Sequence, residues 1–590
     1  MKRIVITGSG IVSAIGVGKQ ETLESLLREQ SGIGSMRILQ SAHTELPVGE
    51  VPLSTEKMRA ILDFTAPASR SALLGILAAR EALKDAKIDP SLLAKSAFIS
   101  GTTVGGMETT ERDYLAWQHH QHTETIALHD AGATTETIVR ALGEVAFQTT
   151  VSTACSSALN AIISGANMLK LGQFDCVIAG GTECLSKFHL NGFNSLMILD
   201  HEPCRPFDDT RAGLNLGEGA AYVVLETEES ALKRGAEILA YVSGYANACD
   251  AYHQTASSEN GEGAYLAMTG ALNMANLAPS DINYVNAHGT ATPNNDQSES
   301  VALRRVFGEM MPAVSSTKSL TGHTTSASGS VETVICLLCM QYGFAPANVN
   351  FHTPMTNGIL PLAHNQQMEI RHVMCNSFAF GGNDSCLILS SPHSLPANND
   401  LSTISQRYST NLQIFKSSAS VDYRQYLSAM EARRMTEQMR RIIGAAHEVL
   451  EQAGIATPDA IITGTEWGCL TSTLQFLDPL CNEGEDGLKP TSFMQSTHNT
   501  VSSTVAMKLK CHGYNSTFSH GADSLAHARR EAENLLHLGL AKSVLVLGFD
   551  EADERWNNIL SNVNRSVANI ATAELITFIP SSLISSTVRE

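Results

Sequence analysis

The chain has 590 residues, 43% of them hydrophobic and 17% charged, so it is long enough to bury several hydrophobic cores. It carries 40 Lys and Arg against 59 Asp and Glu, a formal net charge of −19, which argues against nucleic acid as a partner. No apolar run reaches the length of a membrane span, and the 12 cysteines show neither metal nor disulfide spacing. These features predict a cytoplasmic protein in reducing surroundings.

Two motifs near the N-terminus do not predict a cofactor or metal site. The run MKRIVITGSGIV predicts a buried first strand and not a signal peptide, because Gly8 and Gly10 interrupt the apolar stretch. Its G-S-G begins like a dinucleotide fingerprint, but Ser13 stands where the third glycine belongs. The histidines of WQHHQH (117–122) are neighbours in a polar loop without a second cluster, so no metal ligand is assigned.

Cys155 lies in VSTACSSALNAI (151–162), where a β-favouring run meets two serines and then a helical pattern. This order predicts a turn from strand to helix. The first turn of a helix has unpaired N–H groups and a partial positive charge, and both lower the pKa of a thiol. A nucleophile is one interpretation; a small buried hydrophobic residue is the other, because most cysteines are of that kind.

Three later segments place polar side chains in glycine-rich surroundings. They are NAHGTATP (286–293) with His288, KSLTGH with Lys318 and His323, and NSFAFGGN (376–383). A stretch of small residues that ends at Glu332 follows His323 and would let a helix pack closely behind it. Each segment alone is a weak signal, but their order after Cys155 is specific.

With CRPFDDTRAGLNLGEGA (204–220), these segments resemble the motifs of the β-ketoacyl-acyl-carrier-protein synthases, elongating condensing enzymes of the thiolase superfamily, over roughly residues 1–395. The resemblance implies an α/β thiolase fold, in which two similar mixed-sheet halves, 1–240 and 241–390, are layered α/β/α/β/α. It also implies an active site between the halves, with Cys155 from the first and both histidines from the second.

The resemblance implies a decarboxylative Claisen condensation. Cys155 would take an acyl group from a carrier thioester, and malonyl-acyl carrier protein would lose CO2 and attack that acyl group to give a 3-oxoacyl carrier. The backbone N–H groups of Cys155 and Phe380 would stabilise the tetrahedral oxyanion, and His288 and His323 the enolate oxygen. The resemblance implies no cofactor bound by this chain itself, because both substrates are attached to the phosphopantetheine of an acyl carrier protein.

Further roles follow from the resemblance. Lys318 would orient the region of the second histidine, and Glu332 would hold the lysine. Thr290 and Thr292 alternate, so their hydroxyls share one side of an extended segment and could bind the pantetheine amides, although threonines also simply suit a strand end.

Phe380 corresponds to the family's gate to the acyl pocket, and Phe378 and Gly381 beside it are assigned to substrate binding. Here the sequence departs from the family pattern: Ala379 replaces a glycine, and Asn383-Asp384 replaces Thr-Asn, which predicts a stiffer gate. Ser326 likewise stands where the family has glycine.

An acidic carrier protein needs a basic docking patch on this globally acidic chain. The candidates are Lys57, Arg59, Arg70 and Arg205. The alternative is that each is a solvated surface residue.

The chain continues past the ketosynthase-like region through a polar linker (391–409) into a second domain (410–590) that repeats the first half. AIITGTEWGC (460–469) echoes AFISGTTVGG (97–106), and TFSHGADSLAHA (517–528) falls where the Cys155 segment falls. Ala522 or Asp523 takes the cysteine's place, so this domain cannot condense. It resembles a truncated ketosynthase half similar to the chain-length-factor partners of polyketide and aryl-polyene systems.

Two arrangements and two functions remain open at this stage. The second domain could occupy the place of a dimer partner within one chain, or be an appendage on a homodimer of residues 1–395. A non-condensing chain-length-setting or carrier-binding subunit is the alternative function, disfavoured because Cys155, His288 and His323 are all present. A thiolase is disfavoured because it needs a second cysteine as base. The chain-length-factor resemblance favours a polyene or polyketide pathway over general fatty-acid elongation.

Overall fold

The computed structural model describes residues 2–394, 412–418 and 420–579. The predicted linker falls largely outside the described residues; Ser391–Ser394, which are described, form a turn closed by a bond from Ser394 N to Ser391 O. Within the described residues, no helix combines the length and apolar character needed to cross a membrane.

Most strands of the described residues form one large mixed sheet, and β3-β4 and β12-β13 form two small separate sheets. From edge to edge its order is β11 (Ala313–Ser315), β10 (Tyr284–Asn286), β14 (His372–Ala379), β15 (Asn383–Ser390), β9 (Ala240–Cys249), β1 (Ile4–Ser13), β8 (Gly219–Thr227), β7 (Cys176–Glu183), β5 (Ala97–Gly101), β6 (Phe147–Val151), β18 (Tyr514–Phe518), β17 (Ala460–Gly464), β19 (Ser543–Asp550), β20 (Ile570–Phe578) and β16 (Leu412–Lys416). Short local strands are β2 (Gly16–Val17), β3 (Ile33–Gly34), β4 (Val48–Gly49), β12 (Phe344–Ala345) and β13 (Gln366–Gln367).

Five layers make up the first 390 residues, as predicted. Helix α3 (Arg70–Asp85) covers β1 and β8 on the outside, and α10 (Glu262–Ala275) covers β9 and β15. Between them lie α7 (Ser157–Lys170) and α13 (Ser328–Tyr342), which are buried almost along their whole length. A helix between two sheets is mostly apolar or small all round, and both sequences are, apart from buried polar residues such as Asn160 and Glu332, which are hydrogen-bonded. The α/β/α/β/α thiolase fold is therefore confirmed.

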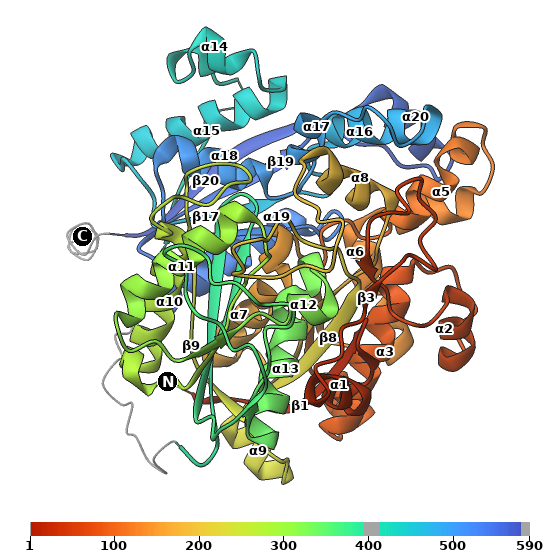
Figure 1. The fold of residues 1–590 in the computed structure, drawn as a ribbon. Helices are drawn as coiled ribbons and strands as arrows, with labels where there is room; N and C mark the ends of the chain where they lie inside the picture. The colour runs from red at the N-terminus through yellow and green to blue at the C-terminus, as the bar shows by residue number, and fades with distance from the viewer. Residues whose placement is uncertain (1, 395–411, 419, 580–590) are drawn as a thin grey trace, which may run out of the picture.

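Other helices flank these layers (Figure 1). In the first 390 residues they are α1 (Lys19–Leu27), α2 (Thr55–Leu62), α4 (Pro90–Leu93), α5 (Met107–Gln118), α6 (Ala131–Leu142), α8 (Lys187–Ser195), α9 (Glu228–Arg234), α11 (Pro293–Phe307) and α12 (Lys318–Thr321). In the C-terminal domain they are α14 (Ala429–Ala432), α15 (Glu437–Ala453), α16 (Leu470–Asn482), α17 (Pro490–Met494), α18 (Thr500–Leu509), α19 (Ser524–His537) and α20 (Glu554–Ser561).

The C-terminal domain repeats the first half of the fold. Its strand order β16-β20-β19-β17-β18 matches β1-β8-β7-β5-β6, with the same parallel and antiparallel neighbours. Helix α15 packs on one face of these strands, as α3 does, and α19 on the other, as α7 does. In Figure 1 these blue elements lie across the top of the molecule. The predicted half-thiolase domain is thus present.

The two copies join edge to edge through β6 and β18, which are antiparallel with Val151 opposite Phe518. Ser152 N donates to Thr517 O at 2.8 Å, and Ser519 N donates to Thr150 O at 3.0 Å. Because Ser152 corresponds to Ser519 and Thr150 to Thr517, these bonds are related by a pseudo-twofold axis. Buried apolar residues of α7 and α19 belong to one continuous core.

Candidate active site

Cys155 lies at a tight turn between β6 and α7, as the sequence predicts. It belongs to a short 3-10 turn, and the preceding Ala154 has φ of +50°, a left-handed conformation uncommon for a residue with a side chain. The Ser157 hydroxyl fixes the turn, because it accepts from Thr153 N at 2.9 Å and donates to Ala154 O at 2.6 Å.

The expected lowering of the Cys155 pKa is wrong for this site. Burial dominates and raises the pKa of the thiol to about 12, while the Lys318 charge and the backbone N–H groups of Phe380 and Cys155 act in the opposite direction. Desolvation therefore outweighs the helix terminus. The same two N–H groups are those expected to form the oxyanion hole, and both point at the sulfur.

The two histidines lie next to the thiol. His323 Nε2 is 3.0 Å from Cys155 Sγ, and its Nδ1 is 2.9 Å from Ser328 Oγ. The ring of His288 stands perpendicular to that of His323, with centroids 5.4 Å apart. Burial first, and Lys318 second, hold the pKa of both imidazoles well below the usual value. Both rings are therefore neutral.

Lys318 connects His288 to Glu332. Its ammonium donates to His288 O at 2.6 Å and to Glu332 Oε1 at 2.5 Å, and lies 3.3 Å from His288 Nδ1. An ammonium has only donors, so His288 Nδ1 accepts and the ring proton lies on Nε2. Lys318 thereby fixes the tautomer of His288, and Glu332 balances the buried charge.

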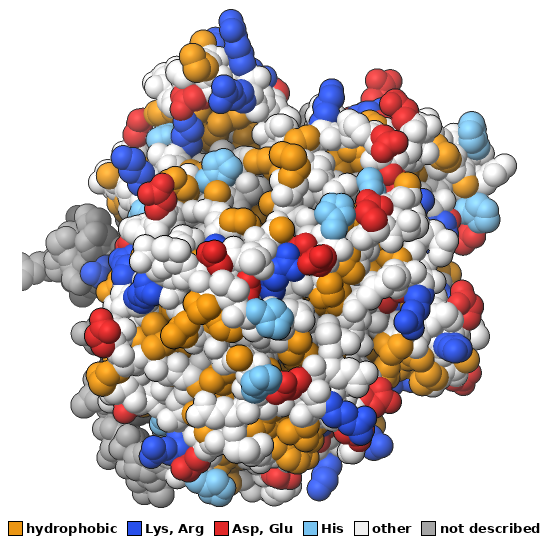
Figure 2. All heavy atoms as spheres, in the orientation of Figure 1, with side chains coloured by type: hydrophobic (Ala, Val, Ile, Leu, Met, Phe, Trp, Pro, Cys, Tyr) orange, Lys and Arg blue, Asp and Glu red, His pale blue; other side chains and the backbone are white. Residues whose placement is uncertain are grey.

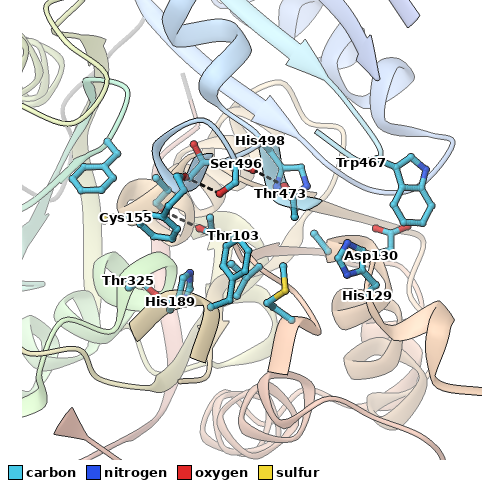
Figure 3. A pocket seen from close by; sticks show the side chains of 18 of the residues that line it. Thr103, His129, Asp130, Cys155, His189, Thr325, Trp467, Thr473, Ser496 and His498 are labelled. Carbon is cyan, nitrogen blue, oxygen red and sulfur yellow. Dashed lines mark hydrogen bonds between the residues drawn. The ribbon is translucent and has the colours of Figure 1, made fainter. Parts of the chain in front are cut away.

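Two cavities meet at Cys155, Phe193 and Phe380. The outer channel is further lined by Leu196, Ile198, Leu214, Thr255, Ala256, Ser257, His288, Thr290, Thr292, Asn295, His323, Phe378, Ala379 and Gly382. The inner cavity is further lined by Thr103, Val104, Met107, His129, Asp130, Ala131, Ala154, Phe188, His189, Thr325, Glu466, Trp467, Thr473, Phe493, Ser496, Thr497 and His498 (Figure 3). The Phe380 ring stacks on that of Phe193, with centroids 5.6 Å apart, and stands where the two spaces meet.

The predicted substrate-binding residues fall into two groups. Thr290 and Thr292 line the outer channel together, with their Oγ1 atoms 2.9 Å apart, and Phe378 lies there 5.8 Å from the His288 ring. Gly381 lines neither of these cavities. It packs on the C-terminal domain, where an added Cβ would lie 2.8 Å from Asn499 Nδ2.

The departures from the family pattern have structural explanations. Ala379 ends β14 and pairs with Asn383, so it is extended, whereas Gly381 and Gly382 take the positive φ values of +83° and +70°. Alanine therefore costs nothing at its position, and whether the gate is stiffer stays a prediction. Ser326 Oγ donates to the buried Glu183 carboxylate at 2.7 Å.

The sequence missed the contacts between the gate loop and the C-terminal domain. Asn499 Nδ2 donates to the carbonyl oxygen of Phe380 at 2.8 Å, and Asn383 Nδ2 donates to Asn515 O at 2.7 Å. Asn499 is buried at the start of α18. Since Phe380 N–H faces Cys155, the C-terminal domain holds the same residue that is expected to supply an oxyanion donor. The replacement of threonine by Asn383 was the one signal in the sequence.

The structure also settles which residue replaces the cysteine in the second copy. Ser524 Oγ accepts from His520 N at 2.8 Å and donates to Gly521 O at 2.6 Å, as Ser157 does in the first copy. Gly521 has φ of +53°, like Ala154. Ala522 therefore occupies the position of Cys155.

Of the four candidates for a basic docking patch, Arg70 is wrong because it is buried, and Arg59 and Arg205 are partly buried and bonded within the chain. Arg70 is buried and forms two bonds with Glu218, at 2.5 and 2.8 Å. Arg205 pairs with Glu202 and Asp200, and Arg59 donates to the carbonyl oxygens of residues 66 and 68. Only Lys57 among the four candidates is fully exposed. Burial depends on tertiary packing, so the sequence pattern overestimated how many of these basic residues are exposed.

A cysteine with two histidines, in a thiolase fold beside a nucleophile-free copy of its first half, defines a ketosynthase. The family models of the "Beta-ketoacyl synthase, N-terminal domain" match residues 1–231 and, in a second form, 406–581, and the "Beta-ketoacyl synthase, C-terminal domain" matches 239–352. The 3-oxoacyl-[acyl-carrier-protein] synthase 2 of Staphylococcus aureus is 33% identical over 411 residues, 66% of this chain and 98% of that protein. The chain belongs to the β-ketoacyl synthase family.

Two solved structures extend the similarity. The ishigamide ketosynthase/chain length factor is 30% identical with a TM-score of 0.63, covering 66% of this chain and 99% of that one. The PfaC ketosynthase-chain length factor covers 99% of this chain and 79% of its own, with a TM-score of 0.76. At 18% identity this second match supports the fold alone.

Proposed function

We propose that this condensing enzyme elongates an acyl group held on Cys155 with malonyl-acyl carrier protein. The observation that carries the assignment is the 3.0 Å approach of His323 Nε2 to a thiol on which two backbone N–H groups converge. Because burial raises the thiol's pKa to about 12, the sulfur is protonated at neutral pH and needs a base. His323 is the neutral group in place to accept that proton.

The first half-reaction transfers the acyl group. The Cys155 thiol gives its proton to His323 Nε2 as sulfur attacks the acyl carbonyl, and the N–H groups of Cys155 and Phe380 stabilise the oxyanion. When the intermediate collapses, the bond to the carrier thiol breaks, and that thiolate takes the proton from His323. Ser328 Oγ can donate or accept, so it suits either tautomer of His323.

The second half-reaction forms the carbon–carbon bond. The malonyl carboxylate leaves as CO2, and its electron pair moves into the thioester carbonyl as an enolate. Nε2–H of His288 stabilises the enolate oxygen, and so does Nε2–H of His323 once its ring proton has moved from Nδ1 to Nε2 by exchange with water. The enolate carbon attacks the acyl-cysteine, the bond to Sγ breaks, and the thiolate takes a proton from water. The products are CO2, a 3-oxoacyl carrier and free Cys155. The chain needs no cofactor of its own in this scheme.

The carrier docks, in this proposal, on the C-terminal domain beside α14. Arg424, Arg433 and Arg434, named here the α14 patch, are exposed, and among the described residues they have no ion-pair partner. Figure 2 shows Lys and Arg side chains gathered at the top of the molecule, over α14. Arg434 lines a cavity together with Gln254, whose neighbour Thr255 lines the outer channel. The patch therefore adjoins the channel through which a pantetheine arm would enter.

The C-terminal domain takes, in this proposal, the place of a dimer partner within the chain. Its support is the pairing of β6 with β18, which occupies the edge of β6 that a second copy of the chain would otherwise pair with. Fusion raises the effective concentration of the two modules. The fold match to the PfaC ketosynthase-chain length factor extends over this domain, which lines the inner cavity through Trp467, Phe493 and His498.

The test is sequential incubation with a panel of acyl-carrier thioesters and then malonyl-carrier, followed by intact mass of protein and carrier. We expect an acyl adduct that Cys155→Ala abolishes, and then a 3-oxoacyl carrier two carbons longer. An equal adduct in the variant would overturn the Cys155 mechanism. An unaltered protein that binds carrier without any adduct would favour the non-condensing subunit.

A further inference from the structure

The far end of the inner cavity carries ionisable side chains. The cavity wall includes the apolar side chains of Val104, Met107, Ala131, Phe188, Phe193 and Phe493 and the polar side chains of Thr103, Thr473, Ser496 and His498. Figure 3 shows Cys155 at one side of the cavity and His129, Asp130 and Trp467 together at the opposite side. An acyl chain that starts on Cys155 and fills the cavity would therefore end beside these groups.

Asp130 has an oxygen available to a ligand at this far end. The residue is 7% exposed, and its Oδ1 accepts from Gly132 N at 2.7 Å as the N-cap of α6. Among the described residues no donor is hydrogen-bonded to Oδ2, and the guanidinium of Arg565 lies 3.9 Å from it. Asp130 therefore lines the cavity with one oxygen that is free to accept a hydrogen bond from a ligand.

The charged and aromatic groups around Asp130 interact mainly with one another. Glu466 is ion-paired with Arg565, whose guanidinium also lies 5.0 Å from the centre of the Trp467 ring. The His129 ring stacks on Trp467, and burial lowers its pKa to about 3, so it is neutral. Burial, reinforced by Glu466, raises the pKa of Asp130 to about 7.

Resting on the proposed condensation, we propose that the inner cavity selects acyl chains whose far end carries a hydroxyl group, which donates to Asp130 Oδ2. A methyl end would cover that oxygen without giving it a donor. A carboxylate end would meet Asp130 and Glu466 as like charges. The substrate class is thus an acyl carrier thioester with an uncharged, hydrogen-bonding terminus.

The experiment compares acyl-carrier thioesters that end in methyl, hydroxyl or carboxylate, matched in length at each of several lengths. The rate of acylation of Cys155 is followed by intact mass. We expect the hydroxyl-ended chain of the best length to react about tenfold faster than its methyl and carboxylate counterparts, the size of about one hydrogen bond.

Asp130→Ser tests the residue itself, because serine keeps the helix cap but is too short to reach into the cavity. We expect the ratio of hydroxyl-ended to methyl-ended rates to fall to about one. Asp175→Asn, which alters a carboxylate that is 70% exposed beside Lys2, should keep the ratio.

Equal or faster acylation by the methyl-ended chain in the unaltered protein would overturn this proposal, as would an unchanged ratio in Asp130→Ser. Both outcomes leave the condensation standing. Failure of every chain to acylate Cys155 would instead overturn the proposed function.

Discussion

The turn from β6 to α7 and the turn from β18 to α19 have similar backbone conformations, but only the first carries a nucleophilic side chain. In each, a serine hydroxyl, of Ser157 or Ser524, closes the turn with bonds of equal pattern, and a residue with positive φ precedes the key position. The first turn carries Cys155 and the second Ala522.

The strand ends beside these turns are equally similar. Glu183 accepts from Thr103 N at 2.8 Å after β5, and Asp550 accepts from Trp467 N at 2.7 Å after β17. At this turn the second copy has Ala522 in place of a thiol, whereas it keeps the elements that pair with β6 and enclose the inner cavity. The comparison teaches that the same fold can supply a nucleophile in one copy and structural support alone in the other.

The largest effect is expected from exchanging the residues that distinguish the two turns, Cys155 and Ala522. Cys155→Ala should reduce acylation by at least about 10³-fold, because the nucleophile is removed. Ala522→Cys should gain no acyl adduct at its new thiol, since no counterpart of the His288 and His323 segments follows it within the described residues. Intact mass and peptide mapping after incubation with acyl carrier measure both variants, and an adduct at position 522 would show that the turn alone makes a nucleophile.

The pH dependence of alkylation tests whether burial raises the pKa of the Cys155 thiol. With its pKa raised to about 12, the thiol form persists at neutral pH, and the thiolate fraction rises about tenfold per pH unit. The rate of iodoacetamide modification of the Cys155 peptide should therefore climb from pH 7 to 10 without levelling. A free thiol in the unfolded protein levels above about pH 8.5. A plateau below pH 8 in the folded protein would contradict the burial argument.

Removing the Asn499 amide tests whether the second copy supports the first. Asn499→Ala and Asn499→Asp both lose the donor to Phe380 O, and we expect kcat to fall about tenfold with little change in carrier KM, because the oxyanion donor is displaced. Asn558→Ala, on the exposed face of α20, is the matched control. Normal kcat in both Asn499 variants would show that the contact is only packing.

The smallest expected effect is at the α14 patch. Arg433→Glu with Arg434→Glu should raise KM for the acidic carrier about fivefold, because exposed charges contribute about 0.2–1 kcal/mol each. The KM for a small pantetheine thioester should not move, and added salt should shrink the difference. A parallel rise for the small thioester would place the defect in folding and not in docking.

The sequence predicted those parts of the site that lie within contiguous motifs. The expected residues of the site come together, namely Cys155, His288, Lys318, His323 and Glu332. Each could be found because it lies in a short motif that can be recognised from neighbouring residues in the chain.

Properties that depend on tertiary burial were wrong or missed. The thiol pKa and the exposure of Arg70 both follow from what packs around them, which no local pattern encodes. Asn499 is 119 positions from Phe380, and its amide has no motif of its own. Ala522 and Asp523 could not be told apart until the Ser524 hydroxyl fixed the register.

Native mass spectrometry of the protein after incubation with acyl carrier tests the central claim, that one chain holds a complete site built by both copies. We predict particles of one 63.1 kDa chain that carry a single acyl group on Cys155. Acylation confined to two-chain particles, with single chains unmodified, would contradict the account.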